Sequence, residues 1–252
     1  MNSVHPVGGN TAHLTTLGLL TKYWEPGQVK TRLARDIGML AASKLHQNFV
    51  LYLCQSLATV SDRREICLAP FTRAQCVRSA LETERLAGAW EIAPQDNGDL
   101  GRRMARWFEK SLATPLVSNA VLIGSDCPLI SPQMINQASR SLERSDAVVG
   151  PAKDGGYYLI GFNNSLPSNV RQSVFENISW STENVLDQTR LRLRELGLTW
   201  NELETMEDID TISELDRFCS ELAASSTTGE SQTSDQARRQ KLLSEIQSIL
   251  LT

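Results

Sequence analysis

The chain has 252 residues, 41% of them hydrophobic and 21% charged, and 25 basic against 29 acidic side chains give a net charge of −4. A chain of this length buries enough surface to fold without disulfides. Its slightly acidic balance provides no field that would gather a nucleic acid, so we expect no nucleic-acid partner.

Cysteine and histidine usage narrows the chemistry further. The five cysteines include no Cys-x-x-Cys pair, which argues against a zinc knuckle or a disulfide framework and favours a reducing cytoplasm. His5, His13 and His46 are not placed near a candidate nucleophile, so triad hydrolysis and His-ligated metal sites are not indicated. No apolar run is long enough to span a bilayer and no export signal begins the chain, so we expect a cytoplasmic protein without a membrane span.

Apolar segments alternate with amphipathic segments along most of the chain. The hydrophobic periodicity and turn signals predict strands at 17–21, 65–69, 90–93, 120–124, 147–150, 157–162 and 199–203. The same patterns predict helices at 36–59, 72–81, 99–112, 132–144, 181–196 and 211–222. Asp99, Ser131 and Ser181 are the expected N-cap residues of three of these helices.

This order of elements predicts a three-layer α/β/α sandwich. The connection between 147–150 and 157–162 is too short for a helical crossover, so the sheet is expected to be mostly parallel but mixed, with one reversed strand. In open sheets of this kind, ligands bind beyond the carboxyl ends of the strands. The loops that leave the strands are therefore the expected site.

The remaining segments suggest a division of the chain into four parts. Residues 1–15 read as a flexible leader, 16–222 as the α/β domain, 223–236 as a flexible linker and 237–252 as an amphipathic helix. The apolar stripe of this last helix fits either docking on its own domain or contact with a second subunit in a homodimer.

The first unusual loop follows the first strand and spans 22–33. A Pro-Gly turn at Pro26 and Gly27 leads to Lys30, Thr31 and Arg32 just ahead of a helix. Two cations, a hydroxyl and free backbone N–H groups suit a polyphosphate, although an ordinary solvated basic loop has the same composition. The spacing of a Walker A loop is absent.

The second loop, 95–104, combines Asp99 with two glycines. Gly98 and Gly101 would let the backbone approach a flat ligand closely, whereas a simple capped turn needs no ligand at all.

The third loop, 124–128, places Asp126 directly after a buried strand. A carboxylate there points out at the ligand edge of the sheet, where Mg²⁺ or Mn²⁺ would find one protein ligand beside substrate phosphates. Capping of the following turn is the alternative role.

The fourth loop carries an Asp-Gly-Gly turn ahead of an aromatic strand. Asp154, Gly155, Gly156 and Tyr157 fit either a plain hairpin or the wall of a sugar or acceptor pocket.

Taken together, the motifs in these loops resemble a known family. They are Pro-Gly-x-Val-Lys-Thr-Arg-Leu at 26–33, Gly-Asp-Leu-Gly-x-Arg-Met at 98–104, Gly-Ser-Asp-Cys-Pro at 124–128, Asp-Gly-Gly-Tyr-Tyr-Leu-Ile-Gly at 154–161 and Asp-Ile-Asp-Thr at 208–211. Their order over about 17–218 resembles the DUF2064 family, which is grouped with the glycosyltransferases of the nucleotide-diphospho-sugar transferase superfamily. The resemblance implies a GT-A type fold.

The resemblance also implies roles for individual residues. Asp126 would be the metal-binding carboxylate and Asp210 a second one. The expected nucleotide- and phosphate-binding residues are Lys22, Pro26, Gly27, Lys30, Thr31, Arg32, Gln95, Gly98 and Asp99. Two departures from the family pattern stand out: Trp24 replaces the first proline of the first loop, and the segment after Asp210 reads Thr-Ile-Ser-Glu-Leu.

Three functions are compatible with these features. The leading one is metal-dependent glycosyl transfer from a nucleotide-diphospho-sugar to a small-molecule acceptor, with Mg²⁺ or Mn²⁺ on Asp126 and Asp154 as candidate base. The second is nucleotidyl transfer from a nucleoside triphosphate to a phosphorylated small molecule, with release of pyrophosphate. The third is a nucleotide-binding protein without turnover.

Overall fold

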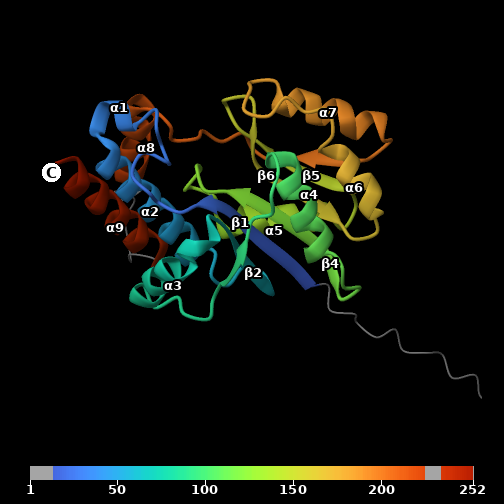
Figure 1. The fold of residues 1–252 in the computed structure, drawn as a ribbon, viewed down its shortest axis with the longest axis horizontal. Helices are drawn as coiled ribbons and strands as arrows, with labels where there is room; N and C mark the ends of the chain where they lie inside the picture. Colours follow the sequence, from blue (N-terminus) through green and yellow to red (C-terminus); the bar gives the residue numbers. More distant parts are fainter. Residues whose placement is uncertain (1–13, 225–233, 252) are drawn as a thin grey trace, which may run out of the picture.

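The computed structural model describes residues 14–224 and 234–251, which form a seven-stranded sheet with helices on both faces (Figure 1). The strands are β1 (Leu14–Lys22), β2 (Arg63–Ala69), β3 (Glu91–Pro94), β4 (Val117–Gly124), β5 (Ala147–Pro151), β6 (Tyr157–Asn163) and β7 (Trp200–Glu202). Their order across the sheet is β3-β2-β1-β4-β6-β5-β7.

One strand of the sheet is reversed, as the short connection before it predicted. β6 pairs antiparallel with both β4 and β5, whereas the other neighbouring pairs are parallel. The carboxyl ends of the parallel strands therefore share one edge, and β6 begins at that same edge. Loops after β1, β3, β4, β5 and β7 consequently meet there.

The helices enclose the sheet in two layers. They are α1 (Ala34–Ile37), α2 (Met39–Ser56), the 3-10 turn η1 (Phe71–Arg73), α3 (Ala74–Thr83), α4 (Leu100–Ser111), α5 (Pro132–Ser141), α6 (Ser168–Val174), α7 (Val185–Glu195), α8 (Ile212–Ala224) and α9 (Ser234–Leu250). α2, α3 and α5 pack on one face, and α4, α6 and α7 pack on the other. The expected three-layer sandwich is confirmed.

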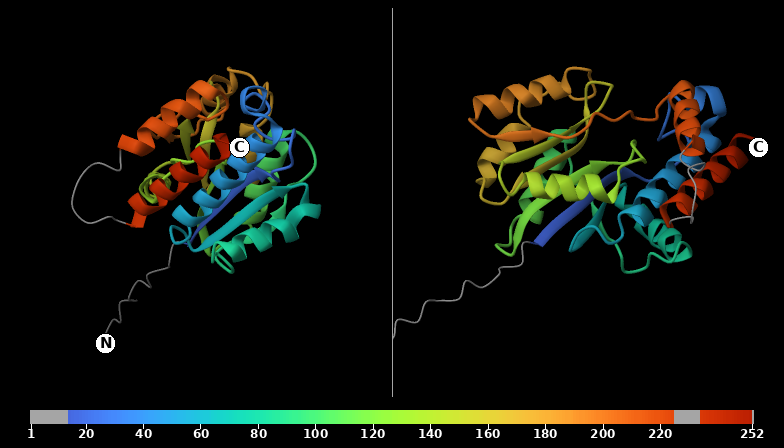
Figure 2. Two further views of the ribbon diagram at one scale, coloured as in Figure 1. Left: turned by 90° about the vertical axis from the view of Figure 1, so that its left-hand side faces the viewer. Right: turned by 180° about the vertical axis from the view of Figure 1, so that it is seen from behind.

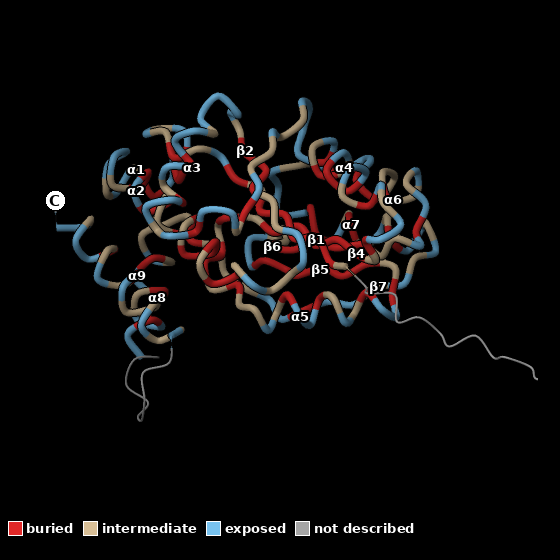
Figure 3. Tube along the Cα trace, turned by 90° about the horizontal axis from the view of Figure 1, so that it is seen from below, coloured by how far each residue is buried: buried red, intermediate tan, exposed pale blue. Residues whose placement is uncertain are grey.

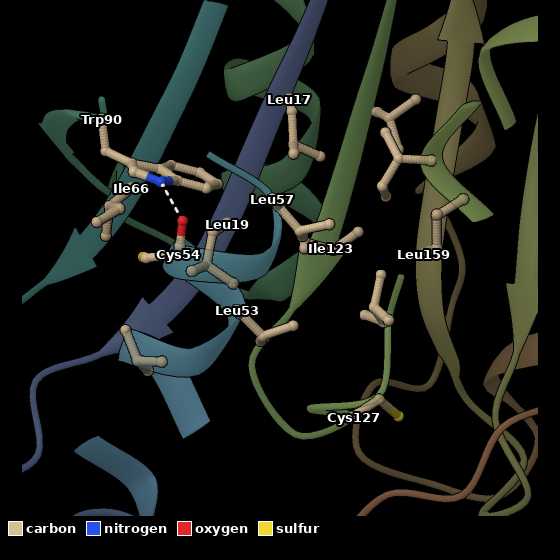
Figure 4. Packing of buried hydrophobic residues seen from close by; sticks show 14 of the residues in the cluster. Leu17, Leu19, Leu53, Cys54, Leu57, Ile66, Trp90, Ile123, Cys127 and Leu159 are labelled. Atoms are coloured by element: carbon tan, nitrogen blue, oxygen red, sulfur yellow. Dashed lines mark hydrogen bonds between the residues drawn. The ribbon is translucent and has the colours of Figure 1, made fainter. Parts of the chain in front are cut away.

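The alternation of side chains along β4 shows how one strand serves two cores. Val121 and Ile123 point into the core beneath α2, α3 and α5, and Ala120 and Leu122 point into the opposite one. Figure 4 shows the first core, in which Leu53 and Leu57 pack beside Leu19 and Ile123. Because helices cover both faces, the central strands β1, β4, β5 and β6 are largely buried, as the colouring of Figure 3 shows, whereas the edge strands β3 and β7 are more exposed.

Several helices differ from their predicted bounds. The stretch expected as one helix at 36–59 is divided into α1 and α2 at Gly38, whose φ of +86° interrupts the helix. α6 was not predicted. Ser181 does not cap a helix: α7 begins only at Val185, and Ser181 lies in the preceding loop with φ +66°. The caps expected from Asp99 and Ser131 are confirmed by hydrogen bonds that their side chains accept.

The predicted leader and linker lie largely outside the described residues. Residues 1–13 and 225–233 are not described. Within the predicted leader, β1 already begins at Leu14; within the predicted linker, α8 ends at Ala224 and α9 begins at Ser234. Across 14–224 and 234–251, no helix is long and apolar enough to cross a bilayer.

The C-terminal helix docks on its own domain. Leu242 and Ile246 of α9 are buried in a third core with Phe49 of α2 and Phe218 of α8. Figure 2 shows α8 and α9 beside α2 at one end of the molecule. Of the two alternatives for this helix, docking in cis is observed, and a homodimer stays a prediction.

We expect this docking to contribute measurably to stability. Ile246 is fully buried, so Ile246→Ala should lower the free energy of unfolding by about 2–5 kcal/mol through lost burial and a residual cavity. Leu251, 88% exposed, is the matched control, and its alanine variant should stay within about 0.5 kcal/mol of wild type. Urea unfolding measures both. Equal effects of the two substitutions would contradict docking of α9 in solution.

Candidate functional site

Two adjoining cavities open at the carboxyl edge of the sheet. One, of about 520 Å³, lies between the loops after β1, β3 and β4; the other, of about 740 Å³, lies between the β5–β6 turn and the loop before α7. Both have sizes typical of small-molecule sites. Arg32, Leu100, Ser181 and Asp210 line both cavities, so the two form one continuous cleft.

The cavities differ in charge, and we name them accordingly. The basic cavity, the smaller one, is lined by four cations, Lys22, Lys30, Arg32 and Arg103, and two carboxylates, Asp126 and Asp210. The acidic cavity, the larger one, is lined by one cation, Arg32, and four carboxylates, Asp154, Glu183, Asp208 and Asp210.

A buried ammonium group lies at the centre of the basic cavity. The Lys30 side chain is only 1% exposed, and its Nζ forms ion pairs with Oδ1 of Asp126 and, at 3.2 Å, with Oδ1 of Asp210. Burial disfavours the charge on Lys30, but the two carboxylates outweigh it and raise the pKa of the ammonium above its ordinary value. Partial burial likewise opposes the charge of Asp126, yet Lys30 holds the pKa of this carboxyl below its usual range.

The backbone around Lys30 explains how the side chain reaches that position. Lys30 has φ +46°, a left-handed conformation that is costly for a residue with a Cβ. Its carbonyl accepts a hydrogen bond from Ala34 N, which joins the loop to α1. The ammonium also lies 5.9 Å from the centre of the Phe49 ring on α2. Surrounding structure therefore stabilises a strained residue at the site.

A polar cluster forms the floor of the basic cavity. Nε2 of His46 lies 3.1 Å from the Lys22 carbonyl, which can only accept, so Nε2 carries the proton in the neutral ring. Thr21 Oγ1 lies 3.2 Å from both this nitrogen and Ser125 Oγ. Burial lowers the pKa of His46, so the ring adds no charge to the cavity at neutral pH. The sequence did not predict His46 as a site residue, because only the packing of α2 against the sheet brings it to the cavity.

Gln95 acts mainly as a structural bridge. Its amide nitrogen donates to the carbonyl oxygens of Thr21 and Cys67, at 2.7 and 2.8 Å, and its oxygen accepts from Arg103 at 3.3 Å. It therefore ties the ends of β1 and β2 together and orients Arg103 into the cavity.

The wall of the acidic cavity is a tight turn packed against the loop before α7. Oδ1 of Asp154 accepts a hydrogen bond from Gly156 N at 2.8 Å. Gly155 has φ +88°, and a Cβ built there would lie 2.0 Å from the carbonyl oxygen of Glu183. Only glycine permits both this conformation and this contact.

Asp208 is a second carboxylate that the sequence did not single out for a role. Its Oδ1 accepts a hydrogen bond from the buried Cys127 thiol at 2.6 Å. Burial raises the pKa of Asp208 to about 6; the thiol hydrogen bond opposes this rise, and the charges of Asp154 and Asp126 add to it. The carboxyl is thus largely ionised at neutral pH and faces the acidic cavity.

Most residues that the sequence selected meet at these cavities. Lys22, Lys30, Thr31, Arg32, Gln95, Asp126 and Asp210 line the basic cavity, and Asp154, Gly156 and Tyr157 line the acidic one. Pro26, Gly27, Gly98, Asp99 and Gly155 line neither; Asp99 caps α4 and Gly155 shapes the turn. Arg103 and Ser181 were missed, although the Arg-Arg pair after Gly101 was a visible signal for the former.

The residues expected to bind a metal fit that role only in part. Asp126 and Asp210 converge on one point, but Lys30 already contacts both. Across the described residues, no group of three or more His, Cys, Asp or Glu side chains is arranged to hold a metal ion. Two carboxylates completed by substrate phosphates remain a common arrangement for Mg²⁺.

Comparison with known proteins identifies the family. The model of the family described as "Uncharacterized protein conserved in bacteria (DUF2064)" matches residues 53–182, just over half of the chain. A candidate nucleotide-diphospho-sugar transferase from Desulfovibrio desulfuricans G20 has a similar structure, with a TM-score of 0.74 and 29% identity, over 93% of this chain and 97% of that one. Among curated proteins, none matches this sequence.

More distant structures share the fold alone. A nucleotidyl transfer enzyme from Methanothermobacter thermautotroptrophicus aligns with a TM-score of 0.57 and 14% identity, over 84% of this chain and 99% of that one. A cytidylyltransferase from Leptospira borgpetersenii aligns with a TM-score of 0.56 and 12% identity, over 94% and 97%. The fold is therefore the one that nucleotide-diphospho-sugar transferases and nucleotidyltransferases use.

The Lys30 ion pairs generate a prediction about stability. Asp126→Asn leaves a buried ammonium with only Asp210, so we expect it to lower the free energy of unfolding by about 1–3 kcal/mol. Lys30→Met removes the buried charge and leaves two half-exposed carboxylates that water can solvate, so its effect should stay within about 1 kcal/mol. Urea unfolding at pH 7 compares the two. A larger loss in Lys30→Met than in Asp126→Asn would contradict this account of the ion pairs.

The packing of Gly155 generates another prediction, for which Gly197 is a matched control. Both glycines have positive φ, but a Cβ on Gly197 meets nothing within 4 Å. Gly155→Ala should therefore destabilise the protein by about 1–3 kcal/mol more than Gly197→Ala, because only the former adds a clash with backbone to the conformational cost. Thermal unfolding measures the difference, and equal losses would disprove the close contact with Glu183.

Proposed function

The chain belongs to the DUF2064 family, and from this premise we propose that it is a transferase that moves a glycosyl group from a nucleotide-diphospho-sugar to a small-molecule acceptor. The observation that carries the proposal is the basic cavity, where cations from the end of β1, the loop after it and the first turn of α4 surround one space at the carboxyl edge of the sheet. The likeness to the Desulfovibrio protein supports the same class of donor.

In this proposal the basic cavity binds the diphosphate of the donor. Lys22 and Arg32 are exposed and Arg103 is partly exposed, so their charges are available to phosphate oxygens. Negative charge grows on the diphosphate as the bond to the sugar breaks. Cations held in fixed positions stabilise that charge without having to reorganise during the reaction.

We propose that Asp126 and Asp210 also hold a divalent cation, Mg²⁺ or Mn²⁺, when the donor is bound. Such an ion would neutralise part of the charge on the leaving diphosphate. Lys30 and the cation would compete for the same two carboxylates. A bound diphosphate would offer Lys30 a new anionic partner, so binding of the nucleotide and release of Lys30 from the carboxylates belong together.

The acidic cavity would then receive the acceptor. Asp154 remains our candidate for the group that takes the acceptor proton, since it is exposed and lines this cavity. Asp208 lines the same cavity and is a second carboxylate in reach of an acceptor there.

Nucleotidyl transfer is the alternative, and the fold shared with nucleotidyltransferases is the observation that favours it. The two reactions differ in what they release. A nucleoside diphosphate released from a sugar nucleotide supports glycosyl transfer, whereas pyrophosphate released from a nucleoside triphosphate supports the alternative.

Ligand binding to the folded protein provides the first test. A panel of nucleotides and sugar nucleotides, each with and without Mn²⁺, should contain one that raises the melting temperature by roughly 5–10 °C at about 100-fold excess over its Kd, equivalent to about 2.7 kcal/mol. Asp126→Asn should remove the part of this shift that depends on Mn²⁺. The exposed Asp216 on α8 lines neither cavity of the cleft, so Asp216→Asn is the control and should preserve the shift.

Two results would count against the proposal. If no nucleotide shifts the melting temperature, the basic cavity is not a donor site. If Asp126→Asn retains the full shift with Mn²⁺, the assignment of the metal to Asp126 and Asp210 is wrong.

A further inference from the structure

The two cavities carry opposite charge although they share four residues. The acidic cavity has four carboxylates against the single cation Arg32, which itself lies at the boundary with the basic cavity. Such a difference across one cleft separates ligands by charge, because like charges that are brought close together repel each other.

Most of this negative charge is not neutralised by the protein. Of the four carboxylates, Asp210 alone has a cationic partner, Lys30. In the described part of the chain, Asp154, Glu183 and Asp208 form no ion pair: Asp154 accepts from the backbone of its own turn, and Asp208 accepts from the neutral thiol of Cys127. A ligand in the cavity therefore meets a negative potential.

The walls of the cavity are rigid and partly aromatic. Tyr157, at the start of β6, and Trp180, in the loop before α7, both line it. The Trp180 ring packs so closely on α4 that a Cβ added at Gly101 would lie 2.6 Å from it. Ser181, next to Trp180, is held with φ +66° at the junction of the cavities. Aromatic faces of this kind pack on C–H surfaces and attract cations.

From these observations we infer that the acceptor is a hydroxyl compound that carries either a cationic amine or no charge, and that phosphorylated compounds are excluded. This inference rests on the proposed function. In the transfer step, the bond between the anomeric carbon and the diphosphate breaks and its electron pair leaves with the nucleoside diphosphate. The acceptor oxygen forms the new bond to that carbon, and its proton passes to a carboxylate. Asp154 is our candidate for this base.

The test uses three sugars that differ mainly in charge. Glucosamine, glucose and glucose 6-phosphate are each titrated into the protein, and their binding is measured by saturation-transfer NMR. The protein is first saturated, in the absence of Mn²⁺, with a nucleoside diphosphate of the class that the thermal-shift panel identifies. We expect the Kd of glucosamine to be lowest and that of glucose 6-phosphate to be at least about tenfold higher. The ratio of these two dissociation constants should fall as the salt concentration is raised from about 50 to about 500 mM, because ions screen the charges that distinguish the two sugars.

Isosteric variants assign the effect to particular side chains. Glu183→Gln and Asp154→Asn each remove one charge, and the asparagine keeps an oxygen that can accept from Gly156 N. Together the two substitutions should lower the ratio of the Kd of glucose 6-phosphate to the Kd of glucosamine by about tenfold. Glu143→Gln is the control, since Glu143 is exposed in the turn before β5, at the opposite edge of the sheet.

The outcomes separate this inference from the proposed function. Tightest binding of glucose 6-phosphate, equal binding of all three sugars, no binding of any of them, or no effect of the two substitutions would overturn the inference. Each would leave the nucleotide-dependent thermal shift intact. Loss of that shift would instead overturn the proposed function.

Discussion

The ion pairs of Lys30 are the interaction on which the site depends. A buried ammonium must be compensated, and Asp126 and Asp210 do so from segments 96 and 180 residues away in the sequence. The loop after β1, the end of β4 and the segment after β7 are thereby held at one point. The left-handed backbone of Lys30 is tolerated because this compensation, together with the Phe49 ring, outweighs the strain.

The reversed strand determines the other half of the cleft. Because β6 runs against its neighbours, it starts at the edge where β4 and β5 end, so the turn at 154–156 lies beside the carboxyl ends of the sheet (Figure 1). A parallel β6 would need a crossover there, and the turn could not be so short. The tight contact of Gly155 with Glu183 then fixes the wall of the acidic cavity.

Sequence patterns predicted the layers and most of the cleft, for identifiable reasons. The continuous apolar run at 120–124 and the polar residues directly after it predicted that Asp126 would lie at the ligand edge, since the end of the strand alone determines that position. The position of His46, the conformation of Ser181 and the acidic surroundings of Asp208 depend on contacts between distant segments. Local periodicity carries no information about such contacts, and the short α6 and the break at Gly38 escaped prediction because single turns have weak patterns.

The shared residues connect the two halves of the cleft chemically. Arg32 and Asp210 line both cavities, with opposite charges, so charge that develops on one side changes the potential on the other. In the proposed donor complex, Lys30 would pair with the diphosphate and a divalent cation would replace it on Asp126 and Asp210, so Asp210 would keep a cationic partner only while the metal is bound. Without the metal, an anion in the basic cavity would make the acidic cavity more negative and strengthen its preference for a cationic or neutral partner, which would give the cleft an order of binding.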